Sequence, residues 1–288
     1  MQKSSKNIVL KWSSPHSRKL PDSADTPIVM GVLNVSLDSF SDGGKYTNVD
    51  LALQHCQNMI SEGAKIIDIG AESTKPNATQ VSIDDELSLL LTPLKEIRKA
   101  FADVAISVDT YKPEVARIAI ENGADIINDV QTKCENGVCK MAELASQLGC
   151  PMIATHNCRG EKLSGDFFEN LKKGISERVK CLKKSGLSDT QIIVDAGVGF
   201  GKTRDENFEI VARLAELRSL GLPILLGVSR KSMFADIAGN DMRLRDFATS
   251  IVSALATQFQ SADILRVHDV GATITSIKTT KEILKWTK

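Results

Sequence analysis

The chain has 288 residues, of which 42% are hydrophobic, and equal numbers of acidic and basic side chains give it a formal net charge of zero. This length and apolar content allow a large core, and a neutral chain lacks the overall charge that draws a protein to nucleic acid or to an anionic membrane. An anionic small ligand would therefore need a local cluster of cations.

The sequence shows no targeting or membrane-spanning segment. The first 25 residues are mixed and polar, without the apolar stretch of a secretory signal, and no run approaches the roughly 18 apolar residues of a membrane span. The cysteines form no C-x-x-C pair, so we expect free thiols in a cytoplasmic protein. They are Cys56, Cys134, Cys139, Cys150, Cys158 and Cys181.

From residue 28 onward, short apolar runs alternate with longer segments of helical periodicity. The short runs are rich in β-branched residues, which favour strands. The predicted strands are residues 28–35, 64–70, 104–110, 125–130, 151–156, 192–197, 223–229 and 262–269. The predicted helices are residues 49–62, 84–101, 113–122, 137–148, 166–185, 205–220, 246–260 and 272–286.

This alternation predicts an α/β fold with a parallel sheet and helical crossovers. Eight strand–helix units match a (β/α)8 TIM barrel, and a doubly wound sheet is the structural alternative. No change of composition divides the repeating region. We therefore predict a single barrel domain at residues 28–288, preceded by an N-terminal extension at residues 1–27 that closes the barrel bottom as a hairpin.

Every predicted strand ends on polar or charged residues. Catalytic groups of such barrels lie at the C-terminal ends of the strands. One polar residue there could simply cap the next helix, whereas eight on one rim favour a ligand site. The residues are Asn34, Glu72, Ser73, Thr74, Lys75, Asp109, Asn128, Asp129, His156, Asp195, Ser229, Arg230, Lys231, Arg266, His268 and Asp269.

These strand-end residues form two chemical sets. Asp109, Asn128 and Asp195 offer acceptors for a ligand edge made of N–H groups, such as an aminopyrimidinone ring, and Lys231 could donate to its carbonyl oxygen. The second set is the local cationic cluster that a phosphate-bearing ligand would need. It comprises Lys75, Arg230, Lys231, Arg266 and His268.

Two nucleotide-binding motifs match only partly. In the segment 196–203, AGVGFGKT, Ala196 replaces the first glycine of a P-loop, and Lys202 replaces the last glycine of a dinucleotide fingerprint. The histidines have no partner at i+4 and the cysteines lack zinc spacing, so no metal motif is visible. His55 lies in a helical run and is interpreted as structural.

Eight segments together give the chain a family resemblance across residues 29–285. It resembles the dihydropteroate synthases, which are pterin-binding barrel enzymes. The segments occur in the family's order, which makes the combination specific. They are MGVLNVSLDSFSDGG, DIGAESTKP, SVDTYKPEVA, ADIINDV, THNCRG, DAGVGFGK, GVSRKSMF and DILRVHDV.

The resemblance implies a transferase of folate biosynthesis. Such an enzyme condenses 6-hydroxymethyl-7,8-dihydropterin diphosphate with 4-aminobenzoate to give 7,8-dihydropteroate and diphosphate, with Mg²⁺, and sulfonamides act on the family as aminobenzoate mimics. The partners implied are these small molecules and a second copy of the chain in a homodimer. Neither nucleic acid nor membrane is expected.

The family pattern also implies roles for individual residues. The pterin would contact Asp109, Asn128, Asp195, Phe200, Gly227 and Lys231. The diphosphate would contact Asn34, Arg266 and His268, with the metal at Asn34. Aminobenzoate would contact Phe40, Thr74, Lys75, Pro76 and Ser232. The residues expected to act in catalysis are Lys231, Asp38 and Asp42.

The segment after the first strand is unusually polar for a strand–helix connection. Residues 36–44 combine acids and hydroxyls with two glycines at the end. We expect this loop to lack order without ligand and to close over bound diphosphate. Closure would bring Phe40 toward aminobenzoate and Asp38 or Asp42 toward the metal or the developing cation.

The chain departs from the family pattern at several positions. Leu37, Ala71, Lys75, Thr155 and Ala196 stand where the family commonly has Pro, Gly, Arg, Met and Pro. Lys75 keeps the charge of arginine but loses its forked geometry. The segment RLRDFATS lacks a Gly-Thr pair common at the start of the seventh helix, in the region through which the family forms dimers.

Two other functions fit a similar pocket. One is a pterin-binding paralogue without catalytic activity, which only the substitutions at 37, 75 and 196 would favour. The other is a barrel that transfers a methyl group from methyltetrahydrofolate to a corrinoid. That enzyme binds no diphosphate, so the cations of the SRK and RVHD segments disfavour it.

Overall fold

The computed structural model describes residue 12 and residues 14–23, 26–35, 48–72, 80–160 and 165–287. In this part of the chain eight parallel strands pair in sequence order, and the last pairs with the first, so that the sheet closes. The predicted TIM barrel is confirmed. The strands are β1 (Ile28–Asn34), β2 (Ile66–Gly70), β3 (Ala105–Asp109), β4 (Ile126–Asp129), β5 (Met152–Thr155), β6 (Ile192–Asp195), β7 (Ile224–Leu226) and β8 (Ile264–Val267).

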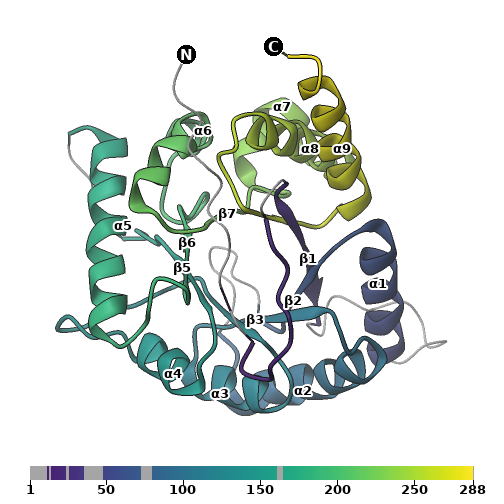
Figure 1. Cartoon of the computed structure of the whole chain (residues 1–288), viewed down its shortest axis with the longest axis vertical. Coiled ribbons are helices and arrows are strands. Elements are labelled where there is room, and N and C mark those ends of the chain that lie inside the picture. Colours follow the sequence, from purple (N-terminus) through teal and green to yellow (C-terminus); the bar gives the residue numbers. More distant parts are fainter. Residues whose placement is uncertain are drawn as a thin grey trace.

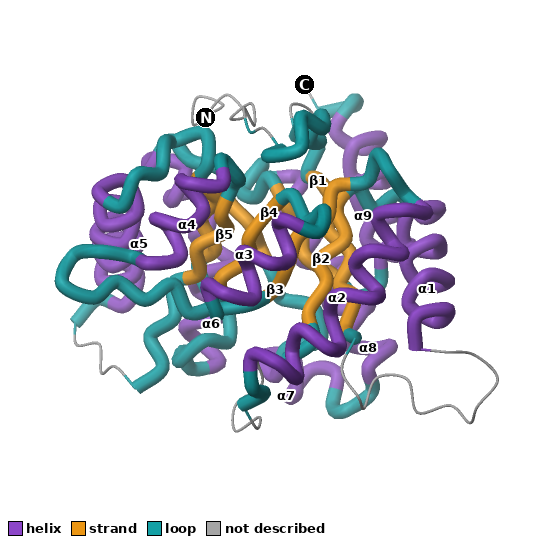
Figure 2. Tube along the Cα trace, turned by 90° about the horizontal axis from the view of Figure 1, so that it is seen from below, coloured by secondary structure: helices purple, strands orange, loops and turns teal. Residues whose placement is uncertain are grey.

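Helices alternate with the strands and surround the barrel as an outer ring (Figure 1). In side view the strands lie in the middle, enclosed by helices (Figure 2). The α-helices are α1 (Asn48–Glu62), α2 (Ile83–Ala100), α3 (Pro113–Glu121), α4 (Lys140–Leu148), α5 (Phe167–Lys184), α6 (Arg204–Arg213), α7 (Ala235–Ala238), α8 (Met242–Gln258) and α9 (Val270–Leu284). The 3-10 helices are η2 (Leu214–Leu220) and η3 (Ser232–Phe234).

The largest differences from the predicted boundaries concern two helices. The predicted helix 205–220 is α-helical only as far as Arg213 and then tightens into η2. The predicted helix 246–260 begins four residues earlier, at Met242. It does so because the Asp241 carboxylate caps its first turn, which satisfies a backbone N–H that has no partner inside the helix.

The strand alternation sorts apolar side chains into two clusters. Outward residues such as Ile67 pack beneath the helices, and inward residues such as Ile66 fill the lower half of the barrel. Burial of each such side chain stabilises the fold by roughly 1.5–3 kcal/mol. The inner cluster comprises Trp12, Leu20, Ile28, Met30, Ile66, Ala105, Ile126, Ile153, Ile193, Leu225 and Ile264.

The described part of the N-terminal extension closes the bottom of the barrel. Trp12 and Leu20 belong to the inner apolar cluster, and the Ser14 hydroxyl donates to the Asp125 carboxylate at 2.5 Å, just before β4. In residue 12 and residues 14–23 no strand forms, so the expected hairpin is absent there. Polar side chains of the segment, such as Ser14 and Arg18, bond to residues at the barrel bottom.

Two expectations from composition can be compared with the described residues. Among them, no helix is both long and apolar enough to cross a membrane. All six cysteines are free thiols, as predicted; Cys134 is exposed and the other five are buried.

Candidate active site

Polar side chains line the upper half of the barrel interior, directly above the inner apolar cluster. The strand register places Asp109 opposite Asn128 and Thr155 opposite Asp195. Asn128, Thr155 and Asp195 lie two residues beyond an inward apolar residue of their strands, and Asp109 lies four beyond inward Ala105, so all four point to the same side. This set, called the polar layer below, comprises Asp68, Ser107, Asp109, Asn128, Thr155, Asp195 and Arg266.

Arg266 on β8 joins two carboxylates of the polar layer. Its Nε donates to Oδ2 of Asp68 at 2.6 Å, and one terminal nitrogen donates to Oδ2 of Asp109 at 2.6 Å. The Asn128 amide also donates to Oδ2 of Asp68, at 3.1 Å. One guanidinium therefore holds two acidic groups from neighbouring strands in fixed positions.

The other oxygens of both carboxylates have no partner among the described residues. Oδ1 of Asp68, Oδ1 of Asp109 and the Ser107 hydroxyl are buried without a hydrogen bond. Buried polar atoms are nearly always paired, because an unmade hydrogen bond costs about 1–3 kcal/mol. Three such atoms in one layer indicate that a ligand with N–H donors completes the site.

The charges of the polar layer shift the pKa values of its members. Burial, opposed by the Arg266 guanidinium, raises the pKa of Asp109 to about 7, and the neighbouring Asp68 adds to the increase. Burial alone would lower the pKa of Arg266, but Asp68 and Asp109 hold it above its ordinary value. The guanidinium stays charged, while Asp109 can exchange a proton near neutral pH.

Asp195 and Lys231 form the opposite side of the polar layer. Oδ1 of Asp195 accepts the Gly197 N–H at 2.8 Å, and Oδ2 accepts the Thr155 hydroxyl at 3.2 Å. The Lys231 ammonium donates to the Val198 carbonyl at 2.5 Å. Burial, opposed by Asp195, lowers the pKa of Lys231 to about 8, so the ammonium group can lose its proton in mildly alkaline solution.

The loop after β6 depends on glycine to approach these groups. Gly197 has φ of 71°, and a Cβ there would lie 2.1 Å from the carbonyl oxygen of His156. The turn presents the ring of Phe200 between two cations, with Lys231 Nζ 4.9 Å and the Arg159 guanidinium 4.8 Å from its centroid. Both distances suit cation–π interactions.

Two members of the predicted cationic cluster differ from expectation. Burial, together with nearby Arg230 and Arg266, lowers the pKa of His268 to about 3, so this imidazole is neutral at pH 7. Its Nδ1 lies 2.9 Å from the Ser229 hydroxyl. Arg230 forms two 2.8 Å hydrogen bonds to Asp246 on α8, so its charge is already balanced. His268 therefore offers a neutral ring and not a cation, and Arg230 positions a loop.

The backbone at Arg230 is unusual for a non-glycine residue. Its φ is 60°, a left-handed conformation that few residues adopt without support. Support comes from α8, because Asp246 holds the side chain and the Arg245 guanidinium donates to the Arg230 carbonyl at 3.2 Å. Since Lys231 follows directly, α8 sets the direction in which Lys231 enters the site.

The remaining predicted residues are less central or fall outside the described chain. Gly227 is buried next to Arg266, where a Cβ would lie 3.8 Å from that of the arginine. Asn34 is exposed at the upper end of β1, and Ser232 is exposed at the start of η3. The predicted residues outside the described ranges are Leu37, Asp38, Phe40, Asp42, Ser73, Thr74, Lys75 and Pro76, and the whole of the predicted loop 36–44 also lies outside them.

Asp68 is the main site residue that sequence reasoning missed. It lies inside the apolar run IIDIG and not at its end, so reading strand ends passed over it. The signal was its place in the alternation, because Asp68 is two residues beyond inward Ile66 and two before Gly70. A charged residue that faces into a barrel needs a buried partner, and here that partner is Arg266.

A second missed group surrounds Lys112, in the connection after β3. Its ammonium donates to Glu72 at 2.5 Å, to Glu86 at 2.6 Å and to the carbonyl of Val81 at 2.7 Å. The Tyr111 hydroxyl donates to the other Glu72 oxygen at 2.9 Å. Lys112 thus connects residues on both sides of the sequence segment that contains Thr74, Lys75 and Pro76.

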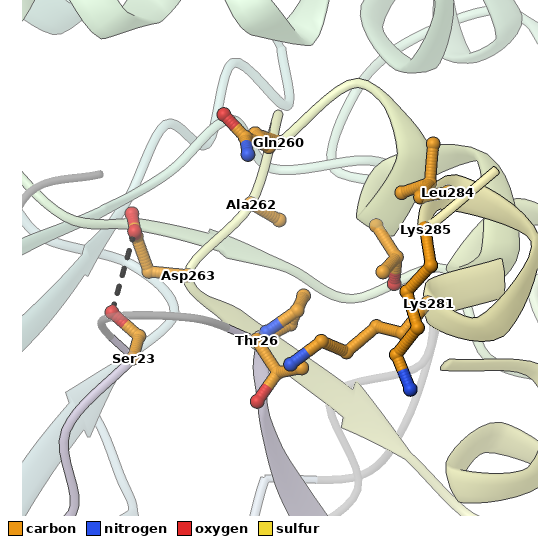
Figure 3. Close-up of a pocket in the computed structure, with 10 residues that line it drawn as sticks. Ser23, Thr26, Gln260, Ala262, Asp263, Lys281, Leu284 and Lys285 are labelled. Atoms are coloured by element: carbon orange, nitrogen blue, oxygen red, sulfur yellow. Dashed lines mark hydrogen bonds between the residues drawn. The ribbon is translucent and has the colours of Figure 1, made fainter. Parts of the chain in front are cut away.

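A pocket of about 290 Å³ lies at the opposite end of the barrel (Figure 3). It is bounded by Ser23 and Thr26 of the N-terminal segment, by Asp263 before β8, and by Lys281 of α9 and Lys285 directly after it. Both Asp263 oxygens are already engaged, since Arg218 and the Ile224 N–H bond one of them and Ser23 bonds the other. This end of a TIM barrel contributes to stability. Because both oxygens of Asp263 already form hydrogen bonds within the protein, we do not assign a ligand to this carboxylate.

No group of three or more His, Cys, Asp or Glu side chains within the described ranges is arranged to hold a metal ion. Asn34, the predicted metal ligand, is an amide and would supply one oxygen from an exposed position on the rim. Mg²⁺ sites commonly use only one or two protein oxygens, with water and substrate phosphates as the other ligands, so Asn34 fits such an ion.

Most of the chain is similar in sequence to known pterin-binding enzymes. Residues 30–268 match the model of the pterin binding enzyme family. A dihydropteroate synthase of Streptococcus pyogenes is 41% identical over 246 residues, which is 85% of this chain and 91% of the relative.

Solved structures show the same likeness in three dimensions. A Xanthomonas albilineans dihydropteroate synthase with 4-aminobenzoic acid superimposes with a TM-score of 0.86 at 34% identity, covering 96% of this chain and 100% of the other. One from Clostridium difficile in the presence of pteroic acid gives 0.83 at 36% identity, covering 89% and 96%. With its closed barrel and polar layer, the chain belongs to the dihydropteroate synthase family of pterin-binding enzymes.

Proposed function

We propose that the polar layer binds 6-hydroxymethyl-7,8-dihydropterin diphosphate and that the barrel mouth joins it to 4-aminobenzoate. The observation that carries this proposal is the Arg266 clamp, which leaves one oxygen of Asp68 and one of Asp109 buried and without partners. An aminopyrimidinone ring presents adjacent N–H donors along one edge. Such an edge supplies what these carboxylates lack.

The pterin ring would lie flat across the polar layer. Asp109, Asn128 and Asp195 accept from its amino and ring N–H groups, and Lys231 donates to its carbonyl oxygen. Phe200 packs beside the ring. Gly227 leaves room for it, since a larger side chain there would extend over Arg266. A ligand without matching donors would leave these buried groups unpaired, which gives the site its selectivity.

The diphosphate would extend from the ring toward the rim of β1 and β8. Arg266 supplies positive charge. Two of its guanidinium nitrogens bond to Asp68 and Asp109, and the third forms no hydrogen bond with a described residue. His268, neutral at pH 7, supplies a ring N–H donor. Asn34 would hold Mg²⁺, which supplies charge that stabilises a departing diphosphate when it is bound.

The chemistry is a displacement at the pterin methylene carbon. The carbon–oxygen bond to diphosphate breaks, the aminobenzoate nitrogen forms the new bond to carbon, and that nitrogen releases one proton. Fixed cations lower the barrier because they face the oxygen on which negative charge accumulates. An aromatic amine arrives neutral, so a strong general base is not needed.

Aminobenzoate would bind at the outer side of the mouth. We assign the aminobenzoate carboxylate to Ser232, which is exposed directly after Lys231. The roles of Phe40, Thr74, Lys75 and Pro76 toward aminobenzoate, and of Asp38 and Asp42 in catalysis, stay predictions from the family pattern.

An assay with both substrates tests the proposal directly. With pterin diphosphate, 4-aminobenzoate and Mg²⁺, we expect equal amounts of diphosphate and dihydropteroate to form. Binding of pterin without diphosphate release would instead identify a non-catalytic pterin-binding protein. Methyl transfer from methyltetrahydrofolate to a corrinoid would identify the third candidate function.

Arg266→Ala tests the assignment of the diphosphate. Because Arg266 also holds Asp68 and Asp109, we expect the variant to lose affinity for both ligands, and to lose more for the pterin diphosphate than for the same pterin without phosphates. Equal losses for the two ligands, measured by calorimetry, would remove Arg266 from the diphosphate site. Lys173→Ala, on the exposed face of α5, is the matched loss of a positive charge and should change neither affinity.

We also propose that the protein is a homodimer that associates through α8. Apolar residues spaced by three or four positions form an exposed stripe on this helix, which includes Phe247 (64% exposed), Ile251 (49%) and Leu255 (41%). Stripes of this kind on a barrel surface usually mark contact with another protein. The stripe comprises Leu244, Phe247, Ile251, Leu255 and Phe259.

Sedimentation of a double variant tests the dimer. We expect Phe247→Glu with Ile251→Glu to sediment as a monomer, because four charges would be buried in a symmetric contact. Lys173→Glu changes charge on α5, outside the stripe, and should leave the dimer intact. A wild-type chain that sediments as a monomer would contradict the proposal.

A cytoplasmic location is the remaining proposal. The six free thiols support it, since cysteines of exported proteins usually form disulfides. Cell fractionation with an antibody against the chain would test the location. Recovery with the membrane fraction or outside the cell would contradict it.

A further inference from the structure

Two cysteines flank a tight turn in the connection between β4 and α4. The predicted helix 137–148 starts only at Lys140, because Glu135 and Val138 exchange both of their backbone hydrogen bonds, at 2.9 and 3.0 Å. Asn136 and Gly137 form the turn, with φ of 51° and 76°. Positive φ at both positions is the signature of a type I′ hairpin turn.

The hairpin places the cysteines opposite each other. Next to a hydrogen-bonded pair of an antiparallel ladder comes a non-hydrogen-bonded pair, whose Cα atoms lie about 4.5 Å apart. Cys134 and Cys139 occupy these positions, directly outside Glu135 and Val138. Disulfides span Cα distances of about 4.4–6.8 Å, so the hairpin needs little movement to accept one.

The side chains also meet. The thiols of Cys134 and Cys139 are close enough to shift each other's pKa, and Cys181 on α5 also lies near Cys134. The hydrogen bond from Cys134 lowers the pKa of Cys139 against the effect of burial, and backbone N–H groups at the start of α4 add to this. The interaction therefore favours the deprotonated form of Cys139 over that of Cys134.

We propose that Cys134 and Cys139 are a redox-active pair that closes to an intramolecular disulfide with hydrogen peroxide and reopens with a dithiol reductant. Exposed Cys134 is the sulfur that peroxide reaches. The Cys134 thiol passes its proton to the Cys139 sulfur and attacks a peroxide oxygen; the O–O bond breaks, the leaving hydroxide takes up that proton and departs as water, and Cys134 becomes a sulfenic acid. The Cys139 sulfur then displaces the hydroxyl group as a second water. Overall, two thiols are oxidised to one disulfide and one peroxide is reduced to two waters.

The position of the hairpin connects this chemistry to the barrel mouth. Glu135, Asn136 and Val138 line a pocket of about 430 Å³ together with Tyr111 and Asp129, which lie at the upper ends of the neighbouring strands. A disulfide at the base of the hairpin would therefore fix one wall of this pocket.

Peptide mapping of the full chain gives a direct test. Trypsin cleaves after Lys133 and Lys140, so residues 134–140 are released as one peptide that contains both cysteines. After brief treatment with peroxide, we expect this peptide to lose two hydrogens and to take up no alkylating reagent. Dithiothreitol should restore two alkylation sites, while Cys150 and Cys56 stay alkylatable after unfolding throughout.

Variants separate this pair from its alternatives. Cys134→Ser should abolish the mass change, and because Cys134 is exposed this variant should fold. Cys181→Ser should form the disulfide as fast as the wild-type chain. Gly137→Val should slow it about tenfold or more, since a β-branched residue resists positive φ.

Three results would overturn the proposal. The first is a link between peptide 134–140 and the peptide that contains Cys181. The second is a Cys134 sulfinic acid formed without disulfide. The third is a disulfide between two chains, visible on a non-reducing gel.

Discussion

Two buried clusters of charged residues, one at each end of the barrel, both pair aspartate with arginine. They differ in how many of the carboxylate oxygens form hydrogen bonds. At the bottom, Asp125 uses both oxygens: one accepts from Ser14 and Arg18, and the other accepts from Arg98 at 2.6 Å and from the Ile106 N–H at 3.0 Å. At the top, Asp68 and Asp109 each leave one buried oxygen without a partner among the described residues.

The difference distinguishes a structural cluster from a binding cluster. A carboxylate whose oxygens are all bonded has nothing left to offer a ligand, and its removal mainly costs stability. A carboxylate whose first oxygen is held by the protein and whose second oxygen forms no hydrogen bond can accept one from a ligand. The two clusters are alike in charge and burial. They are distinguished by the number of hydrogen-bond partners of each carboxylate oxygen.

The largest expected effect is at the top of the barrel. Asp109→Asn keeps the shape but replaces an acceptor with a donor that would face the N–H groups of the pterin. We expect kcat/KM to fall by about 100-fold or more, with the free energy of unfolding changed by less than about 1 kcal/mol. Steady-state kinetics and urea unfolding measure both. A loss of several kcal/mol in stability would place Asp109 with the structural cluster.

The opposite result is expected at the bottom. Asp125→Ala removes the partner of buried Arg98 and leaves several donors unpaired, so we expect a loss of about 3–5 kcal/mol in stability. Activity per folded molecule should be unchanged at low temperature. Arg18→Ala removes a longer, 3.4 Å contact to the same carboxylate and should cost at most about 1 kcal/mol.

The comparison also predicts how binding depends on pH. The pKa of Asp109 is about 7, so pterin affinity should fall below pH 7 as the acceptor becomes protonated. The pKa of Lys231 is about 8, so affinity should also fall above pH 8 as the ammonium group loses its proton. Each limb should approach about tenfold per pH unit. Lys231→Arg should remove the alkaline limb in calorimetric titrations, and a profile flat from pH 6 to 9 would contradict both assignments.

The pKa of Asp109 has the opposite consequence for folding. Its value in the folded protein is raised above that of the unfolded chain, so it favours folding at acidic pH. That contribution is lost as the pH rises through about 7. The neutral pH at which the site binds best is therefore one at which this carboxylate opposes folding.

The smallest expected effect is at Lys112, near the mouth of the barrel. Its ammonium group already donates three hydrogen bonds within the protein. Lys112→Ala should raise KM for aminobenzoate a few-fold, about 1 kcal/mol, because Glu72 and Val81 would no longer be joined. KM for the pterin diphosphate should change less. Lys112→Arg, which keeps the charge, should recover most of the effect. Equal changes in both KM values would mean that Lys112 only stabilises the fold.

The fold was predictable because each buried parallel strand is a short apolar run with a polar residue at its end. Asp109, Asn128 and Asp195 were found in this way, and the structure gathers them in one layer. Asp68 was missed because a side chain inside an apolar run faces inward or outward according to register, which only the closed barrel fixes.

Other features depended on contacts distant in sequence. Arg230 was read as a free cation because its partner, Asp246, lies on a later helix. His268 was counted as a positive charge because its sequence gives no sign of the burial and the neighbouring arginines that keep it neutral.

Helix α8 connects the surface to the site. Its inner face holds Arg230 through Asp246 and Arg245, and thereby the backbone that delivers Lys231, while its outer face exposes Phe247 and Ile251. A substitution on this helix would therefore alter catalysis without touching substrate or inhibitor. Substitutions on α8 could therefore give resistance to a drug that competes with the pterin, and a survey limited to pocket residues would not detect them.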